Sequence, residues 1–565
     1  RWTDSVKGWL IGAGLLAAVV GVQAATNPVA SEADARPTTD FPDIVVRATR
    51  LSLAPDEQPY AIYRHDRTAI EQGVGRAALD RIDFSPGVLI QRTGPGQVSP
   101  YIRGLTGRQS LLLFDGVRLS HAAMRGGPNQ YAALLPDMSL DGIDAVLGSS
   151  SVVNGSDGLT GALDFRLAPP GRGVDAAASP WLDTRVDRAN GYQTSVGIDG
   201  AGDGWRYSIE GSFFDFHDRI GGKDAADNLF GERRGKRRIP NTAYDQWSLA
   251  GRAAYDGFDE HALQLAFGHT RQNDAPRPDG YYANSGSSSR ISRYYDPETF
   301  SYVHLRDVWT PTGLFFDQLA TTAWWHRHDE RQIREDLTDA GNYRRREYDD
   351  VIDSVGIEPQ FTSRFERHEL TYGLLALAER TDNAYREFRS SSGVNPGGAV
   401  AYKPGNWRAN TTLTDGARYN TFAVYAQDLW QLTDRWSLLS GLRYTYVDWS
   451  FDVAESDTDD VTGGLRAGYR LSERQMLFAG VSKAFRAPNL SDLDGASDRG
   501  SSGTFAFGNP ELDPEVSYTG EIGWRYHHGR DQLGVSLFYT HIDDVIQRVY
   551  PAGGGAGTTA NGERA

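Results

Sequence analysis

Two adjacent carboxylate pairs, Asp459–Asp460 and Asp543–Asp544, are candidates for acid–base chemistry in this chain. Such catalysis needs two groups with different pKa values, held on either side of a substrate. Both pairs stand where turns or strand ends are expected, so solvated surface charge is the simpler interpretation. No catalytic trio is evident, and the absence of cysteine excludes disulfides and thiolate metal sites. We therefore expect a protein that is not an enzyme, with no catalytic metal and no cofactor.

The composition favours an exported β-sheet protein over a nucleic-acid-binding one. The 565 residues carry a formal charge of −16, whereas contact with a phosphate backbone needs clustered lysine and arginine. The chain has 63 glycines, 27 tyrosines and 13 tryptophans, which suits many turns and belts of aromatic residues. The sequence therefore predicts a turn-rich β protein without a nucleic-acid partner.

The stretch from Ser99 to Ala168 is typical of a small α+β module made of short strands. Asp115-Gly116 separates the apolar runs 110–114 and 117–119, which is a strong signal for a two-residue hairpin. Residues 88–90, 143–147 and 163–167 are further short strands. Upstream, residues 69–82 carry apolar side chains at roughly helical spacing and predict a helix that ends before Pro86-Gly87.

Beyond Pro169-Pro170-Gly171 the pattern changes to long segments in which apolar and polar residues alternate. This period of two occurs at 205–213, 263–268, 436–446, 518–526 and 533–539. It is typical of membrane β-barrel strands, although a soluble β-sandwich also alternates. The polar faces carry charges and no second sheet is evident to cover them. Because a bilayer leaves no backbone group unpaired, we expect the strands to close into a barrel.

Several blocks in the same order resemble TonB-dependent outer-membrane receptors. They include IRGLTGRQSLLLFDGVRL (102–119), RGGPNQY (125–131), SSVVNGSDGLTGAL (150–163), AFRAPNL (484–490) and NPELDPE (509–515). The resemblance implies an all-β dominated fold, in which an N-terminal α+β plug domain (51–170) fills a transmembrane antiparallel β-barrel (171–565). The family has 22 barrel strands and ends on a strand with a terminal aromatic residue. About 14 to 16 strands are expected here, so we expect the sequence to be truncated at its C-terminus.

The N-terminal residues predict export and coupling. Residues 1–24 have the pattern of a signal peptide cleaved after Ala24, with a membrane anchor as the alternative. Residues 25–50 form a periplasmic linker. Within it the stretch 43–50 could add as a strand to the sheet edge of another protein, or be an ordinary first strand. The resemblance implies that it is the TonB box, with core residues Asp43, Ile44, Val45, Val46, Arg47 and Ala48.

The resemblance also implies the function: active uptake of a scarce ligand across the outer membrane of a Gram-negative-type bacterium, driven by TonB. We expect a monomer embedded in outer-membrane lipid, with a ferric siderophore as ligand. Haem, cobalamin and carbohydrate are alternatives, and a passive porin is a different class that a plug disfavours. Haem receptors of the family carry a histidine between the two barrel blocks, whereas residues 489–508 contain none.

Two groups of site residues follow. Arginine and tyrosine offer charge-assisted hydrogen bonds and aromatic faces to an anionic or catecholate ligand. The candidates are Arg125, Asn129, Gln130 and Tyr131 on the plug and Arg277, Tyr281 and Tyr282 on the loops. His121 is a weaker candidate for the same ligand. Separately, the acidic run 455–460 could bind calcium.

The second group would hold the plug in the barrel. The resemblance implies two plug arginines paired with barrel glutamates. Arg103 matches the first, but Leu147 replaces the second. The alternation places Glu521 on the inward face with Glu515 at the start of the same strand, and Arg118 is a possible second partner.

Overall fold

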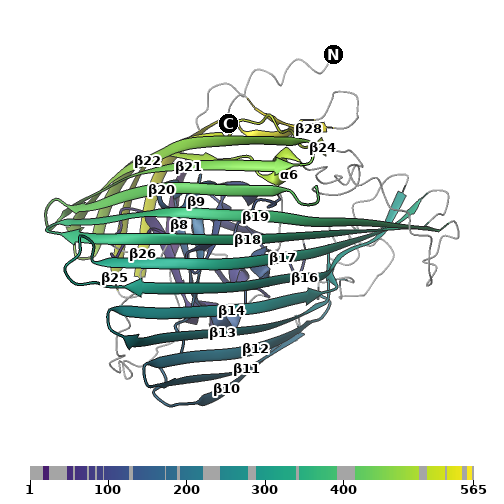
Figure 1. Cartoon of the computed structure of the whole chain (residues 1–565), viewed down its shortest axis with the longest axis horizontal. Helices are drawn as coiled ribbons and strands as arrows, with labels where there is room; N and C mark the ends of the chain where they lie inside the picture. The colour runs from purple at the N-terminus through teal and green to yellow at the C-terminus, as the bar shows by residue number, and fades with distance from the viewer. Residues whose placement is uncertain are drawn as a thin grey trace.

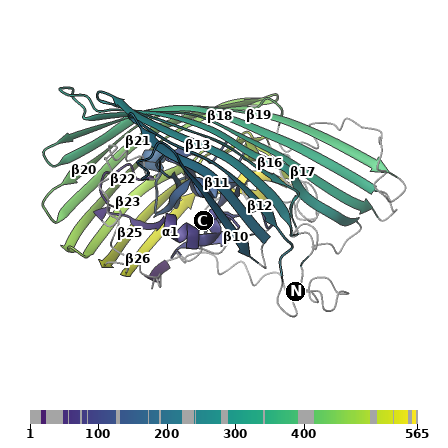
Figure 2. The same ribbon diagram turned by 90° about the horizontal axis from the view of Figure 1, so that it is seen from below.

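The computed structural model describes residues 17–23, 48–54, 57–72, 76–82, 85–92, 94–125, 131–171, 173–187, 191–220, 239, 242–277, 288–338, 343–390, 414–494, 506–528, 531–549 and 557–562. Two units follow one another along the chain. A compact unit of short elements comes first, and a large curved sheet of long strands then wraps around it, with the first unit on the concave side of the sheet (Figures 1 and 2).

The first unit is built around a five-stranded sheet with the order β2-β8-β9-β6-β7. A second sheet joins β3, β4 and β5, and short helical turns connect the strands. The elements are β2 (Ala61–Asp66), α1 (Arg67–Gln72), η2 (Ala78–Ile82), β3 (Val88–Gln91), β4 (Ser99–Ile102), β5 (Leu105–Thr106), η3 (Gly107–Gln109), β6 (Leu111–Phe114), β7 (Val117–Arg118), η4 (Tyr131–Leu134), η5 (Asp137–Ser139), β8 (Leu140–Leu147), α2 (Ser151–Asn154) and β9 (Gly161–Leu167).

The predicted hairpin at Asp115-Gly116 is confirmed. Both residues have positive φ, 53° and 76°, and join β6 to β7. Positive φ at both central residues matches the right-handed twist of the strands, and aspartate and glycine tolerate it best. The Asp115 side chain also contacts the barrel, because one of its carboxylate oxygens accepts a hydrogen bond from Arg306 in the surrounding sheet at 3.1 Å.

The single helix expected over residues 69–82 is wrong. The structure has a short α-helix, α1, and a separate 3-10 turn, η2, with Ala77, Ala78 and Leu79 buried in the core. Asp80 accepts hydrogen bonds from the backbone N–H groups of Arg76 and Ala77, at 3.1 and 3.3 Å. An aspartate that bonds the backbone locally competes with a continuous helix, which explains the break.

The second unit is a β-barrel whose long strands pair antiparallel with their neighbours in chain order. Figure 1 shows them side by side. The strands are β10 (Ser179–Asp187), β11 (Gly191–Gly202), β12 (Trp205–Phe216), β13 (Tyr244–Phe258), β14 (His261–Asn273), β15 (Ala275–Pro276), β16 (Ser288–Trp309), β17 (Gln318–Thr338), β18 (Tyr343–Phe365), β19 (His368–Ser390), β20 (Arg418–Gln431), β21 (Trp436–Phe451), β22 (Ala454–Ser472), β23 (Gln475–Arg486), β25 (Glu515–His528) and β26 (Asp531–Asp543). The remaining elements are β1 (Ala17–Gln23), α6 (Leu490–Leu493), β24 (Ala506–Phe507), β27 (Ile546–Val549) and β28 (Gly557–Asn561).

The alternation of apolar and polar residues along each strand corresponds to the outer and inner faces of this barrel. On β21, Leu442 is 64% exposed and points outward, whereas its neighbour Arg443 is 1% exposed and points inward. On β25, Ile522 is 57% exposed and Glu521 is 6% exposed. Apolar residues therefore face outward and charged residues face the enclosed unit, as expected for a transmembrane barrel. Among the described residues, no helix is long and apolar enough to cross a membrane.

Two-residue turns join most strands at one end of the barrel, and the long connections lie at the other end. The polar stretch 274–293, which its composition predicts to be a loop between strands, is a loop only in part, because β15 and the first residues of β16 lie in it. The pair Asp459–Asp460 was expected on a turn or strand end, but it lies inside β22, where Asp460 forms an ion pair with Lys483. Of the long polar stretches 221–238, 390–410 and 494–509, which the sequence predicts to be loops, the structure describes only residues 390, 494 and 506–509.

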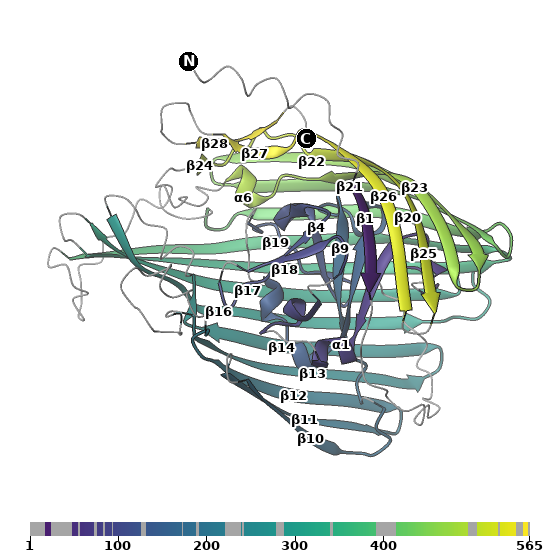
Figure 3. The same ribbon diagram turned by 180° about the vertical axis from the view of Figure 1, so that it is seen from behind.

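The first unit fills the barrel, so it is a plug (Figure 3). Its main hydrophobic core extends into the wall, because Phe300 and Tyr302 of β16 pack in the same cluster as Phe114 and Phe165. Strand β1, inside the predicted signal peptide, pairs with β26. Cleavage after Ala24 would remove this strand, so the signal peptide stays a prediction.

Candidate functional site

The loop after β7 carries Arg125 to the barrel wall near the long connections. Its guanidinium donates two hydrogen bonds to Glu330 of β17, at 2.8 and 2.6 Å. One of these nitrogens also lies 3.2 Å from the hydroxyl of Tyr295 on β16. Burial alone would lower the pKa of Arg125, but the Glu330 carboxylate holds it well above the ordinary value. Arg125 is therefore charged and fixed in position by a two-point contact.

The Tyr295 hydroxyl brings further polar groups to the same place. Arg277 donates to it at 3.3 Å and Gln332 at 2.7 Å. Two of the predicted ligand residues, Arg125 and Arg277, thus meet at one tyrosine that sequence reasoning missed. The group formed by Arg125, Arg277, Tyr295, Glu330 and Gln332 is called the apex cluster. Asn129, Gln130, Tyr281 and Tyr282 lie outside the described residues.

Aromatic and imidazole rings of the plug and of the barrel wall lie next to the apex cluster. Tyr131 is buried and stands edge-on to His121, with ring centroids 4.5 Å apart. His121 contacts His328 of β17 at 4.8 Å, and His328 stacks on Phe300 at 4.5 Å. Burial and the nearby Arg125 lower the pKa of His121 to about 3, so this imidazole is neutral. Tyr131 and His121 therefore line the plug–wall boundary below the apex cluster.

The histidine row continues down the wall with His326 and His304, whose Nε2 atoms are 2.8 Å apart. His326, His328, Glu330 and Gln332 occupy alternate positions of β17, all buried. Their spacing of two was the signal in the sequence, since polar residues at every second position face the inside of a barrel. Within the described part of the chain, no three histidine or acidic side chains are arranged to hold a metal ion. The run 455–460 lies on β22, where successive side chains point to opposite faces.

Only the end of the predicted TonB box is described, since Asp43 to Arg47 fall outside the described residues. The Ala48 carbonyl accepts a hydrogen bond from Asn154 of the plug at 2.7 Å. Arg50 is buried against the wall, where it donates to Glu358 at 3.0 Å and Gln360 at 3.0 Å and contacts the Tyr425 hydroxyl. The segment that follows the predicted box is therefore fixed to both the plug and the barrel.

The structure places Arg103 beside Glu521, as the sequence predicted. The two form an ion pair in which both side chains are almost fully buried. Arg118 does not join them, because it forms an ion pair with Asp157 inside the plug. The second partner is Arg466 of β22, whose guanidinium lies 3.2 Å from the other Glu521 oxygen. The expectation of Arg118 as second partner is therefore wrong.

Residue 147 shows why no plug arginine is needed there. Leu147 is 3% exposed and belongs to the plug core. At the next residue, a Cβ on Gly148 would lie 2.8 Å from Arg466 and 3.0 Å from Glu521, so glycine leaves room for the barrel arginine. The missing plug charge is thus supplied from the wall.

Glu515 has its own set of partners. Arg486 donates to it at 2.5 Å, Gln109 of the plug at 3.2 Å and the backbone N–H of Ile546 at 2.8 Å. Arg486 also bonds Asp492 at 2.8 Å, and Asp492 forms an ion pair with Arg108 of the plug. Sequence reasoning placed Glu515 correctly at the plug boundary but missed Arg108 and Gln109.

Comparisons with known proteins agree with this architecture. Residues 54–162 match the family described as TonB-dependent Receptor Plug Domain, and residues 191–564 match TonB dependent receptor-like, beta-barrel. The vitamin B12 transporter BtuB of Vibrio vulnificus is 22% identical over 92% of this chain and 73% of its own length.

Solved structures share the fold at low identity. The copper transporter OprC matches with a TM-score of 0.69 and 15% identity over 90% of this chain and 75% of its own. The siderophore receptor PirA of Acinetobacter baumannii matches with a TM-score of 0.64 and 15% identity, over 91% of this chain and 78% of its own.

Proposed function

Because the chain belongs to the family of TonB-dependent receptors, which are outer-membrane transporters and not enzymes, we propose that it takes up a ferric siderophore. In this proposal the ligand binds between the long connections and the apex cluster in the outer membrane of a Gram-negative-type bacterium. TonB then pulls on residues 43–50 and displaces the plug. No bond in the ligand breaks, so the site needs recognition and release only.

The observation that carries the ligand class is the apex cluster. Arg125 and Arg277 converge on the Tyr295 hydroxyl, and Arg125 also lies 5.6 Å from the Tyr295 ring. Guanidinium groups and a phenol suit the negative charge and the aromatic edges of a catecholate or carboxylate complex. Glu330 compensates Arg125 in the absence of ligand, so an arriving anion would exchange one partner for another.

The other ligands have less support. The histidine that haem receptors of the family carry is absent from residues 489–508. The similar proteins are named for vitamin B12, copper, siderophores and a haem-carrying hemophore, so cobalamin, haem and a metal ion stay alternatives. A passive porin is disfavoured because the plug fills the barrel and contacts the wall at Arg50, Arg103 and Arg125.

A binding screen tests the ligand class. Purified receptor would be titrated with ferric catecholate and hydroxamate siderophores, haem and cyanocobalamin, with tryptophan fluorescence as the readout. We expect a ferric siderophore to bind most tightly and Arg277→Ala to weaken it at least tenfold. Arg271→Ala, on the outward face of β14, is the matched control. Tight binding of haem or cobalamin without any siderophore binding would overturn the ligand class.

A second experiment tests the coupling to TonB. Proline at residue 45 removes a backbone donor and fixes φ, so Val45→Pro should prevent strand pairing with TonB. We expect binding to persist and uptake by whole cells to fall to the level seen with a protonophore. Val45→Ala, which keeps the backbone donor, should transport normally. Unchanged uptake by Val45→Pro would place the coupling segment elsewhere.

A further inference from the structure

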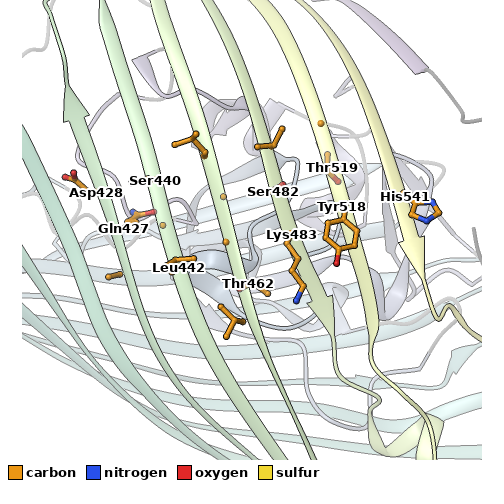
Figure 4. A pocket seen from close by; sticks show the side chains of 18 of the residues that line it. Gln427, Asp428, Ser440, Leu442, Thr462, Ser482, Lys483, Tyr518, Thr519 and His541 are labelled. Atoms are coloured by element: carbon orange, nitrogen blue, oxygen red, sulfur yellow. The ribbon is translucent and has the colours of Figure 1, made fainter.

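The outward face of the barrel is not uniformly filled. A groove of about 960 Å³ crosses strands β20 to β26, lined mainly by aliphatic side chains, glycines and two tyrosines. Figure 4 shows Leu442, Lys483 and Tyr518 around it. A second groove of about 660 Å³ adjoins it and shares Leu370, Ala426, Leu442 and Val461.

The register of the strands explains the groove. One row of outward residues runs Ala426, Leu442, Gly463, Lys483, Tyr518 and His541, and the next runs Asp428, Ser440, Leu465, Val481, Gly520 and Tyr539. Small residues interrupt both rows where the flanking positions carry large ones. A Cβ on Gly520 would meet no atom within 4 Å, so the outer surface is hollow at this residue.

The ends of the groove differ from its middle. Near the turns of the barrel, Asp428 pairs with His368 at 2.8 Å, and His368 stacks on Trp430. Near the long connections, Lys483 pairs with Asp460, and His541 pairs with Asp543 at 3.0 Å. Polar pairs and aromatic residues on the two sides of the groove, with apolar residues between them, follow the profile of a bilayer. The groove thus lies in the apolar band, with its Lys483 side nearer the long connections.

The geometry limits what can fill it. Strands β20 to β25 under the groove are each paired on both sides, so they offer no free edge to an added strand. Strand β26 pairs with β25 and with β1. Two outward positions on a strand are about 7 Å apart, whereas a helix with its side chains is about 10–12 Å wide. Six neighbouring strands at about 4.8 Å spacing give a length of roughly 24 Å. A long, thin and apolar occupant without backbone polar groups fits, and a polypeptide does not.

We propose that this groove is a binding site for an acyl chain of an outer-leaflet lipid that stays attached to the receptor. The chain lies over Gly463 and Gly520, between Leu442 and Val481. The lipid's anionic head lies beside Lys483, on the side of the groove nearer the long connections, because a lysine ammonium has three donors and Asp460 uses one of them. Leu442, 64% exposed, separates the two adjoining grooves, so a second acyl chain of the same lipid lies on its other side. This site is independent of the ligand that the receptor transports.

The test measures lipid that survives delipidation. Receptor extracted from outer membranes would be washed in detergent and examined by native mass spectrometry, with the bound mass identified by fragmentation. The main variant is Gly520→Leu, which fills the hollow. Its matched control is Gly211→Leu on β12, an outward glycine outside the groove whose added Cβ would meet only the Ser248 carbonyl, at 3.7 Å.

We expect one lipid per chain in the parent protein and in Gly211→Leu, and at least a tenfold lower occupancy in Gly520→Leu. Equal retention in all three proteins, no retained lipid in the parent, or a retained polypeptide in its place would overturn the proposal. If Gly520→Leu does not migrate as a folded barrel on a gel, Leu442→Ala is used to test the lipid site in its place. This variant removes the wall between the two grooves without any clash, so it should shorten lipid retention, and unchanged retention would contradict the site.

Discussion

The plug contacts the barrel along β22, β23 and β25 through charged groups, and along β16 and β17 through rings together with the ion pairs Asp115–Arg306 and Arg125–Glu330. On the charged side, Glu521 is shared by Arg103 and Arg466. On the ring side, His328 is buried and neither of its ring nitrogens has a hydrogen-bond partner among the described residues. A buried charge that loses a partner costs about 3–5 kcal/mol, whereas an aromatic pair contributes about 0.5–1.5 kcal/mol. We therefore expect the plug to be held mainly at the charged side.

The largest effect should come from Glu521→Leu. It leaves Arg103 and Arg466 buried without their carboxylate, at a cost of about 3–5 kcal/mol in the free energy of unfolding. Urea titration would measure the loss, and planar bilayers should show higher ion conductance. The control is Glu57→Leu, which removes an exposed plug–barrel ion pair with Arg470 at 2.8 Å and should cost at most about 1 kcal/mol. Similar losses of stability in both variants would contradict the larger contribution expected of the buried Glu521 contacts.

Arg103→Ala should have a smaller effect of about 2 kcal/mol, because Arg466 still compensates Glu521. The bilayer conductance should rise, but less than in Glu521→Leu. Adding Arg466→Leu should cost more than the sum of the single variants, since the carboxylate then has neither arginine. Additive losses in this double-mutant cycle would show that the two arginines do not share Glu521.

His121→Phe tests the ring side through pH. The folded pKa of His121 is about 3 and its ordinary value is 6.5, so the unfolded chain binds the extra proton between these values. Stability is thus lost as pH falls from 6.5 toward 3, and the loss is on the order of 1–2 kcal/mol near pH 5. A phenylalanine ring at this position cannot be protonated, so the variant should lose less stability than the parent between pH 7.5 and 5. An equal loss of thermal stability in the two proteins between pH 7.5 and 5 would contradict a buried neutral His121.

The smallest effect should come from Gln109→Ala. This variant removes one neutral donor from Glu515, which keeps Arg486 and the Ile546 N–H. We expect a loss of about 1 kcal/mol and no change in conductance. A loss as large as that of Glu521→Leu would mean that Gln109, rather than the arginines, holds the plug.

Local patterns in the sequence were sufficient to predict most of the fold. Asp115-Gly116 specifies its hairpin because few residues accept positive φ at both positions. Alternation specifies which side of β21 and β25 faces outward, because successive side chains of a strand point to opposite faces. The helix over 69–82 failed because Asp80 bonds the local backbone, which a periodicity of apolar residues does not reveal.

The sequence by itself determined the plug, the barrel strands and the inward position of Glu521. Only the tertiary structure decided its second partner, Arg466. Arg466, Gly480 and Glu521 occupy one register row across β22, β23 and β25, and the small Gly480 lets the Arg466 side chain cross the row. Register depends on how whole strands pair, and a slip of one residue would turn Arg466 to the outer face. For this reason the charge missing at Leu147 was visible in the sequence, whereas its replacement from the wall was not.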